Sequence, residues 1–64
     1  MKNIVAIIED NEIGTKFEII KIETNRYIVI YYEYFSACGW RKISEEKYPY
    51  SKDAIKYEFD IEVE

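Results

Sequence analysis

The last ten residues of the chain alternate strictly between apolar and charged side chains. The apolar positions are Ile55, Tyr57, Phe59, Ile61 and Val63, and the charged positions are Lys56, Glu58, Asp60, Glu62 and Glu64. Because successive side chains of a β-strand point to opposite faces, a period of two places all the apolar residues on one side. The pattern predicts a half-buried strand over residues 55–64, whereas a helix would scatter these apolar residues around its circumference.

Four earlier segments also have the composition of strands, because they are rich in β-branched and aromatic residues and end at turn-forming residues. They cover residues 3–9, 16–23, 26–35 and 40–43. In the second segment, adjacent Ile19 and Ile20 break the alternation, which indicates a bulge or a strand buried on both faces. Thr24 and Asn25 predict a tight hairpin between the second and third segments, and Gly39 offers a positive φ for the next turn.

Residues 44–53 form the least regular part of the chain. Ser44 and Ser51 each precede charged residues in the manner of a helix N-cap, and Pro49 separates them, so one short helical turn fits here. The sequence therefore predicts an all-β fold with a short helical turn near residues 44–53. The strands form either a five-stranded antiparallel sheet or a small barrel of the SH3 or OB type. No repeat or linker divides the chain, and we expect a single small domain over residues 1–64.

The third segment is the most aromatic part of the chain. As a strand, it would carry Tyr27, Val29, Tyr31, Glu33 and Phe35 on one side, and Ile28, Ile30, Tyr32 and Tyr34 on the other. Neither side has the polar residues of a solvated face. Two interpretations stay open: a central strand buried on both faces, or an exposed platform on which unpaired bases stack.

The small size of the chain favours self-association. A domain of 64 residues buries only about 60% of its unfolded surface, and such domains often need a further stabilising device. We therefore expect a homodimer. Large aromatic residues are enriched at protein interfaces. The expected interface residues are Tyr31, Tyr32, Tyr34, Phe35 and Trp40.

The residues that carry most enzyme chemistry are missing from the sequence. The chain has no histidine, which is the commonest general base and a common metal ligand. The single cysteine, Cys38, has no histidine to activate it, and we expect it to be a buried spectator. Phosphate-binding and nucleophile motifs are also absent. We therefore predict no enzymatic activity, no metal site and no cofactor.

The formal net charge of -4, from 13 acidic and 9 basic residues, narrows the choice of partner. A negative protein is repelled by nucleic-acid phosphates and by anionic membranes, so neither is expected as a partner, and a basic protein surface suits it better. The N-terminal apolar run is much shorter than a signal peptide or a membrane span. We expect a cytoplasmic protein.

The charged face of the predicted last strand suggests a binding surface. Its acidic residues are Glu58, Asp60, Glu62 and Glu64, and on a strand they would repeat about every 6.8 Å. This spacing resembles that of successive phosphates, so such a row fits a basic groove meant for DNA or RNA. The alternative is a solvated outer face whose like charges prevent aggregation.

Two functional hypotheses follow from these observations. The first is a small acidic, non-enzymatic interaction protein: an inhibitor, encoded by a phage or mobile element, that blocks a host nucleic-acid-handling or defence protein in the host cytoplasm. The second is a small β-barrel that binds single-stranded nucleic acid or a peptide through a tyrosine-rich face. That face would comprise Tyr27, Tyr31, Tyr32, Tyr34 and Trp40.

Overall fold

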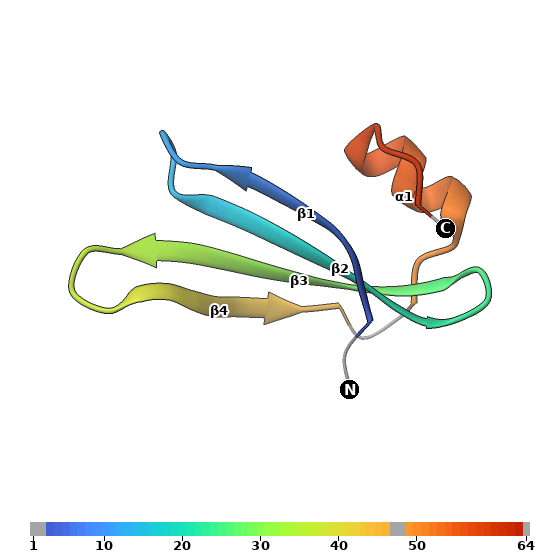
Figure 1. Ribbon diagram of the computed structural model, residues 1–64, viewed down its shortest axis with the longest axis horizontal. Coiled ribbons are helices and arrows are strands. Elements are labelled where there is room, and N and C mark those ends of the chain that lie inside the picture. Colours follow the sequence, from blue (N-terminus) through green and yellow to red (C-terminus); the bar gives the residue numbers. More distant parts are fainter. Residues whose placement is uncertain (1–2, 47–48, 64) are drawn as a thin grey trace.

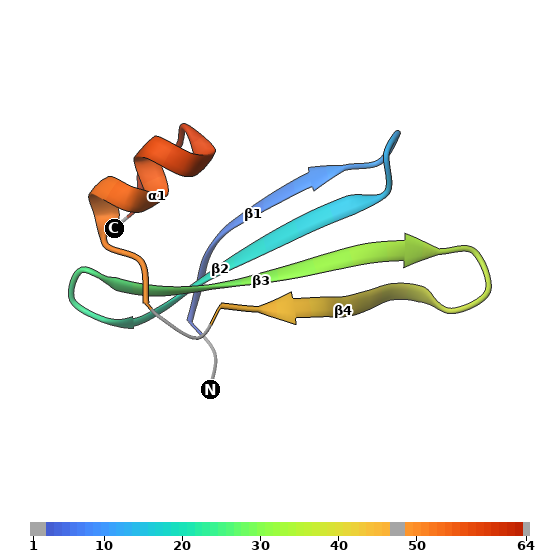
Figure 2. The same ribbon diagram turned by 180° about the vertical axis from the view of Figure 1, so that it is seen from behind.

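A computed structural model describes residues 3–46 and 49–63, and shows an antiparallel sheet with one helix beside it (Figure 1). The elements in these residues are β1 (Ile4–Asp10), β2 (Thr15–Glu23), β3 (Arg26–Phe35), β4 (Gly39–Glu45) and α1 (Lys52–Phe59). Each strand pairs with its neighbour along the chain, so the sheet has the order β1-β2-β3-β4 (Figures 1 and 2). The sheet is open, with β1 and β4 at opposite edges, and the expected barrel is not formed.

The first four predicted strands are confirmed, with ends within two residues of those observed. The hairpin between β2 and β3 turns at Asn25, which has a φ of 59°, and the turn before β4 ends at Gly39, which has a φ of 78°. Ile19 and Ile20 are both buried, so the break in alternation marks a stretch of β2 buried on both faces. The bulge lies further along β2, between Lys21 and Glu23.

The predicted fifth strand is wrong, because its first residues belong to α1. Ser51 caps the helix N-terminus, where its hydroxyl oxygen accepts a hydrogen bond of 3.1 Å from the backbone N–H of Ala54. The helix ends at Asp60, which adopts the left-handed conformation with φ 56° and ψ 40°. The N-cap expected at Ser51 is therefore confirmed, whereas Ser44 lies in β4 and begins no helix. In place of the short helical turn expected near residues 44–53, an eight-residue helix starts at Lys52, at the end of that range, and continues to Phe59.

The alternating pattern arises from two different structures joined at Asp60. Ile55 and Phe59 are four residues apart and therefore lie on the same face of α1, where both contact the core. Ile61 and Val63 follow in a tail that is neither helix nor strand, and both also reach the core. Tyr57 would share the buried face of a strand, but on α1 it is 88% exposed.

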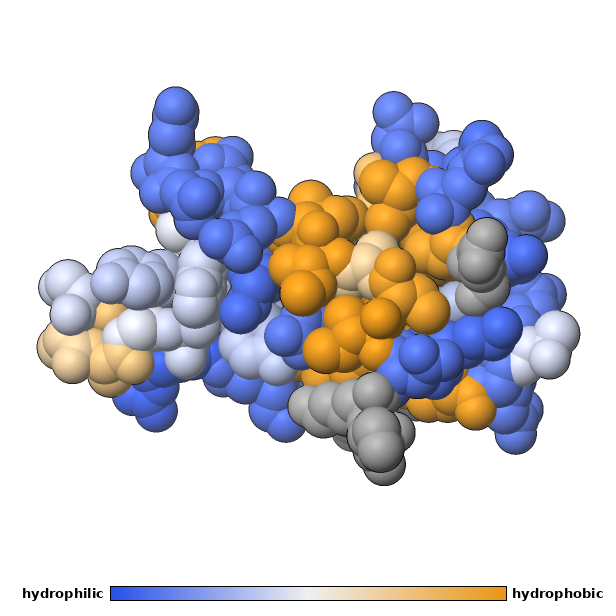
Figure 3. Space-filling model, viewed as in Figure 1, coloured by the Kyte–Doolittle hydropathy of each residue, from blue (hydrophilic) through white to orange (hydrophobic). Residues whose placement is uncertain are grey.

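The hydrophobic core lies between α1, the C-terminal tail and one face of the sheet, which we call the core face. Its buried members are Ile19, Tyr27, Val29, Ile55 and Val63. Figure 3 shows apolar residues gathered around the place where α1 meets the strands, with hydrophilic residues surrounding them. The helix thus completes a core that the sheet alone would leave uncovered.

The other face of the sheet, which we call the open face, carries no helix. Strand register defines its members as Ile4, Ile7, Glu9, Lys16, Glu18, Ile20, Glu23, Arg26, Ile28, Ile30, Tyr32, Tyr34, Trp40, Lys42 and Glu45. The division of β3 into two apolar sides is therefore as the sequence predicted, and β3 is a central strand. Only one of its two sides packs against a second layer within the described chain.

The helical assignment predicts unequal effects for two substitutions in α1. Ile55→Ala should lower the free energy of unfolding by about 2–5 kcal/mol, because the side chain is fully buried. Tyr57→Ala should change it by less than about 0.5 kcal/mol, because Tyr57 points to solvent. Urea denaturation of both variants measures the difference. Equal losses would contradict the helix, since a strand would bury both side chains on one face.

Candidate functional site

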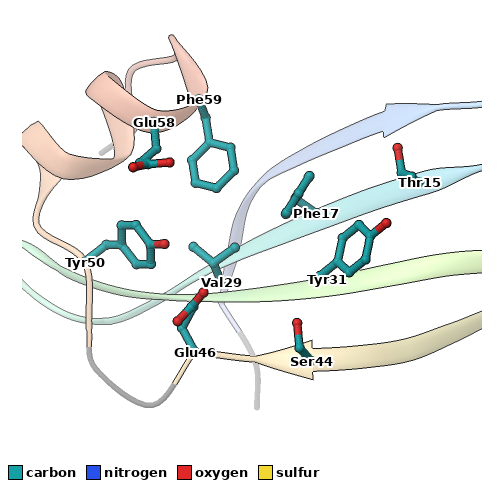
Figure 4. Close-up of a pocket in the computed structure, with 9 residues that line it drawn as sticks. All are labelled: Thr15, Phe17, Val29, Tyr31, Ser44, Glu46, Tyr50, Glu58 and Phe59. Atoms are coloured by element: carbon teal, nitrogen blue, oxygen red, sulfur yellow. The ribbon is translucent and has the colours of Figure 1, made fainter. Parts of the chain in front are cut away.

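A groove opens between α1 and the core face of the sheet (Figure 4). Its volume is about 570 Å³. The lining residues are Thr15, Phe17, Val29, Tyr31, Ser44, Glu46, Tyr50, Glu58 and Phe59. They come from β2, β3, β4, the connection after β4, and α1, so the groove exists only where the helix sits on the sheet.

Aromatic rings form a continuous path along the groove. Phe17 on β2 and Tyr31 on β3 are register partners, and their ring centroids lie 4.9 Å apart. Phe59, the last residue of α1, lies 5.2 Å from Phe17 and 6.2 Å from Tyr50. Tyr50 is fixed by two backbone hydrogen bonds with Tyr27, of 2.9 and 2.7 Å, which join the connection before α1 to the start of β3. The rings therefore have a rigid backbone beneath them.

Within the part of the chain that the structure describes, the two charged groups that line the groove are carboxylates. Glu46 is positioned by its backbone N–H, which donates a 3.1 Å hydrogen bond to the carbonyl oxygen of Val29, and Glu58 projects from α1 (Figure 4). Both side chains are solvent-exposed. Among the lining residues within the described ranges 3–46 and 49–63, there is neither lysine nor arginine. The groove therefore combines an apolar aromatic wall with an acidic rim.

The pKa values of the groove tyrosines reflect this acidic surrounding. Burial, and then the charges of Glu46 and Glu58, raise the pKa of Tyr50 above its ordinary value of 10.0. The hydroxyl of Tyr31 donates a 2.9 Å hydrogen bond to Glu33, and this bond, followed by burial and the Glu33 charge, raises the Tyr31 pKa. The charges of Glu46 and Glu58 thus both raise the pKa of Tyr50, and Glu33 raises the pKa of Tyr31.

The structure separates the acidic residues that were predicted to form one row. Glu58 lies in α1 and faces the groove, Asp60 caps the helix, and Glu62 lies in the tail. The carboxylate of Glu62 accepts a 2.9 Å hydrogen bond from the ammonium group of Lys56. Glu64 lies outside the described residues. Since the three described carboxylates do not follow one strand, the phosphate-like spacing is absent, and only Glu58 belongs to the groove.

The aromatic residues that were predicted to bind a partner are divided between the two faces. Tyr31 lines the groove, and Phe35 lies on the same side at the end of β3. Tyr32, Tyr34 and Trp40 lie on the open face. Tyr27, which the nucleic-acid hypothesis requires at the surface, is fully buried in the core. The tyrosines and the tryptophan therefore do not form a single platform.

On the open face, the aromatic residues surround a lysine of the same chain. The ammonium nitrogen of Lys16 lies 4.7 Å from the ring centroid of Tyr32 and 4.7 Å from that of Trp40. Tyr34 contacts Trp40 edge to face, with centroids 5.4 Å apart. The hydroxyl of Tyr32 donates a 2.8 Å hydrogen bond to Glu18. The aromatic side chains of the open face thus contact one another and charged groups of the same chain.

Of the lining residues, only Tyr31 and Glu58 were predicted as binding residues, and Phe17, Glu46 and Tyr50 are among those that were not identified from the sequence. A two-residue turn at Thr24 and Asn25 would pair Phe17 with Tyr32, but the bulge between Lys21 and Glu23 shifts the register by one residue and pairs Phe17 with Tyr31. Glu46 and Tyr50 had no signal in the sequence. Their positions depend on the path by which the chain leaves β4 and reaches α1.

The groove offers hydrogen-bond acceptors, charge and aromatic surface. Ser44 supplies a hydroxyl, but the chain has no histidine to act as its base. Cys38 is exposed in the turn before β4, so the expectation of a buried cysteine is wrong. Within residues 3–46 and 49–63, no cluster of three or more histidine, cysteine or acidic residues has the geometry to hold a metal ion. These groups suit binding, and they supply no activated nucleophile.

Comparisons of the chain with known protein families, with curated proteins and with solved structures give no match. The part of the chain that the structure describes contains no helix with the length and apolar character needed to cross a membrane. The groove is therefore the feature of the molecule from which a function can be inferred.

Removing a groove carboxylate should lower the pKa of Tyr50. Either Glu46→Gln or Glu58→Gln removes a negative charge that opposes ionisation, while burial, the largest cause, keeps the pKa above 10.0. The raised pKa means that the folded state favours neutral Tyr50. Its contribution to the free energy of unfolding is therefore complete at pH values below the unfolded-state pKa, and is lost as the pH rises through the folded-state pKa. A pH titration of the tyrosine ring carbons by NMR measures the shift. Glu62→Gln, away from the groove, should leave Tyr50 unchanged, and an equal effect there would contradict the assignment.

Proposed function

We propose that this protein is a non-enzymatic interaction protein that binds a basic segment of a partner protein in the groove between α1 and the sheet. The observation that carries the proposal is the combination of an aromatic wall with charged lining groups that are both carboxylates, Glu46 and Glu58. An apolar groove with a few placed polar groups is the usual form of a binding site. The negative charge of the two carboxylates then favours a positively charged ligand.

The side chains that fit this groove best are lysine and arginine. Their aliphatic stems pack on aromatic surface while the charged ends reach the rim. A cation over an aromatic ring contributes about 0.5–1 kcal/mol when exposed and about 2 kcal/mol when desolvated. Tyr31, Tyr50 and Phe59 supply such rings, and the carboxylates of Glu46 and Glu58 supply the counter-charge.

We extend this proposal to the class of partner. Proteins that handle nucleic acids carry clustered lysine and arginine side chains, and the net charge of -4 favours association with such a surface. An acidic protein seated there would exclude the nucleic acid, which is the action of an inhibitor. The proposed context is a phage or mobile element acting against a host defence protein. Charge and groove chemistry support this extension, whereas the spacing of Glu58, Asp60 and Glu62 no longer does.

The proposal predicts that groove carboxylates control binding of basic peptides. Oligolysine and oligoarginine peptides, titrated into the isotopically labelled protein, should shift the NMR signals of Tyr31, Tyr50 and Phe59, and an oligoglutamate peptide should not. The double variant Glu46→Gln with Glu58→Gln should weaken binding about tenfold, because two charge-assisted contacts are lost. Added salt should also weaken binding, since exposed charges are screened.

A matched control variant separates the groove from net charge. Glu12→Gln with Asp60→Asn removes the same two charges at exposed positions outside the groove. It should bind the peptides nearly as tightly as the unchanged protein. Equal weakening in the control and groove variants would show that the peptides respond to overall charge, and would contradict the proposed site.

A further inference from the structure

The open face exposes several large apolar side chains to solvent. Ile4 is 42% exposed, Ile7 is 53% exposed and Tyr34 is 53% exposed. Ile20 and Ile30 on the same face are buried. A contiguous apolar face with charged groups among it is typical of an interaction surface.

The charges on this face are nearly balanced. Its carboxylates are those of Glu9, Glu18, Glu23 and Glu45, and its cationic groups are those of Lys16, Arg26 and Lys42, so four acidic groups stand against three basic groups. The formal balance is -1, against -4 for the whole chain. Two copies of an acidic protein repel each other less through a nearly balanced face than through a strongly acidic one. The balance therefore favours a second copy over a basic or an acidic partner.

One row of the sheet contains charges in a self-complementary order. Strand register places Glu9 of β1 beside Lys16 of β2, Lys16 beside Tyr32 of β3, and Tyr32 beside Lys42 of β4. The row has an acid at one edge of the sheet and a base at the other edge. A two-fold axis that runs parallel to the strands, between β2 and β3, reverses the strand order of the second copy. It brings Glu9 opposite the second copy's Lys42, and Lys16 opposite the second copy's Tyr32.

We propose that two copies of this protein pack face to face through their open faces, with Glu9 paired to Lys42 across the interface. Two twisted sheets pack with their strands within about 30° of each other at a separation of about 10 Å, which long glutamate and lysine side chains can bridge. Because the arrangement is two-fold symmetric, each pair occurs twice. The pairing sets the relative orientation of the two sheets.

The remaining charges of the face already have partners within one copy. Glu18 accepts the hydrogen bond from the hydroxyl of Tyr32, and Glu45 accepts a 3.1 Å hydrogen bond from Lys42. Burying paired groups costs much less than burying isolated charges. Lys42 would then lie between Glu45 of its own copy and Glu9 of the second copy. The ammonium group of Lys42, at the β4 edge of the sheet, would therefore be paired with a carboxylate on both sides.

The dimensions of the molecule are compatible with a stable dimer. The molecule measures 37 × 24 × 17 Å along its principal axes, and the sheet runs along its long direction (Figure 1). A standard interface buries roughly 800 Å² of each partner. Contact over most of this face would cover the exposed isoleucines and Tyr34. The groove would stay free, because it opens on the opposite side of the sheet.

A charge exchange tests both the dimer and its geometry. Analytical ultracentrifugation of the unchanged protein should show a reversible dimer. Glu9→Lys alone and Lys42→Glu alone should each weaken the dimer about tenfold or more, because attraction becomes repulsion at two symmetric places. The double variant should restore the dimer to within a few-fold of the unchanged protein. Circular dichroism spectra should confirm that all variants fold.

Two results would overturn the proposal. A monomer at all accessible concentrations excludes the dimer, and a dimer whose strength does not change in the single variants excludes the Glu9–Lys42 pairing. The groove variant Glu46→Gln with Glu58→Gln should dimerise normally, so failure of groove binding and failure of dimerisation are distinguishable. Binding of a single-stranded oligonucleotide to monomers through Tyr34 and Trp40 would also count against a second copy as the occupant of this face.

Discussion

The packing of α1 against the core face of the sheet is the interaction on which both the fold and the site depend. Ile55 of the helix and Val63 of the tail are both buried. They belong to one core cluster with Ile19 and Val29 of the strands. The same docking places Phe59 beside Phe17 and so closes one wall of the groove. Stability and binding are therefore coupled, because any change that loosens the helix also opens the site. In so small a domain, with a free energy of unfolding of about 5 kcal/mol, the loss of one buried side chain is a large fraction of the total.

The two faces of the sheet have different chemical characters, although they share the same strands. Alternation along β3 sends Val29 and Tyr31 to the groove side, and Ile30 and Tyr32 to the open side. The groove side has carboxylates at its rim, whereas the open side mixes both signs of charge. A strand buried by a helix on one side and by another subunit on the other satisfies the apolar character of both its faces. This arrangement agrees with a protein that binds a basic partner while it is paired with itself.

Local sequence signals identified the four strands, because alternation, β-branched residues and turn residues such as Asn25 all act within a few positions. They failed after Ser51, where Ile55 and Phe59 fit a helix as well as they fit a strand. The choice between helix and strand depends on the sheet. A helix packed on the core face buries its apolar side chains, whereas another edge strand would leave them exposed. For the site, Tyr31 and Glu58 were among the predicted binding residues. Glu46 and Tyr50 could not be found in the same way, since only the three-dimensional path after β4 brings them to the groove.

Lys16 gives the open face a selectivity that its aromatic content alone would not provide. Tyr32 and Trp40 could hold a cation from another molecule, but the chain's own ammonium group already stands over both rings. An intramolecular group acts at an effective concentration of millimolar order or higher, so a free lysine or arginine competes for these rings at a disadvantage. The described residues that line the groove include no such cation. In the proposed binding mode, the Lys16 contacts would therefore leave the groove as the more accessible of the two aromatic clusters for a basic ligand.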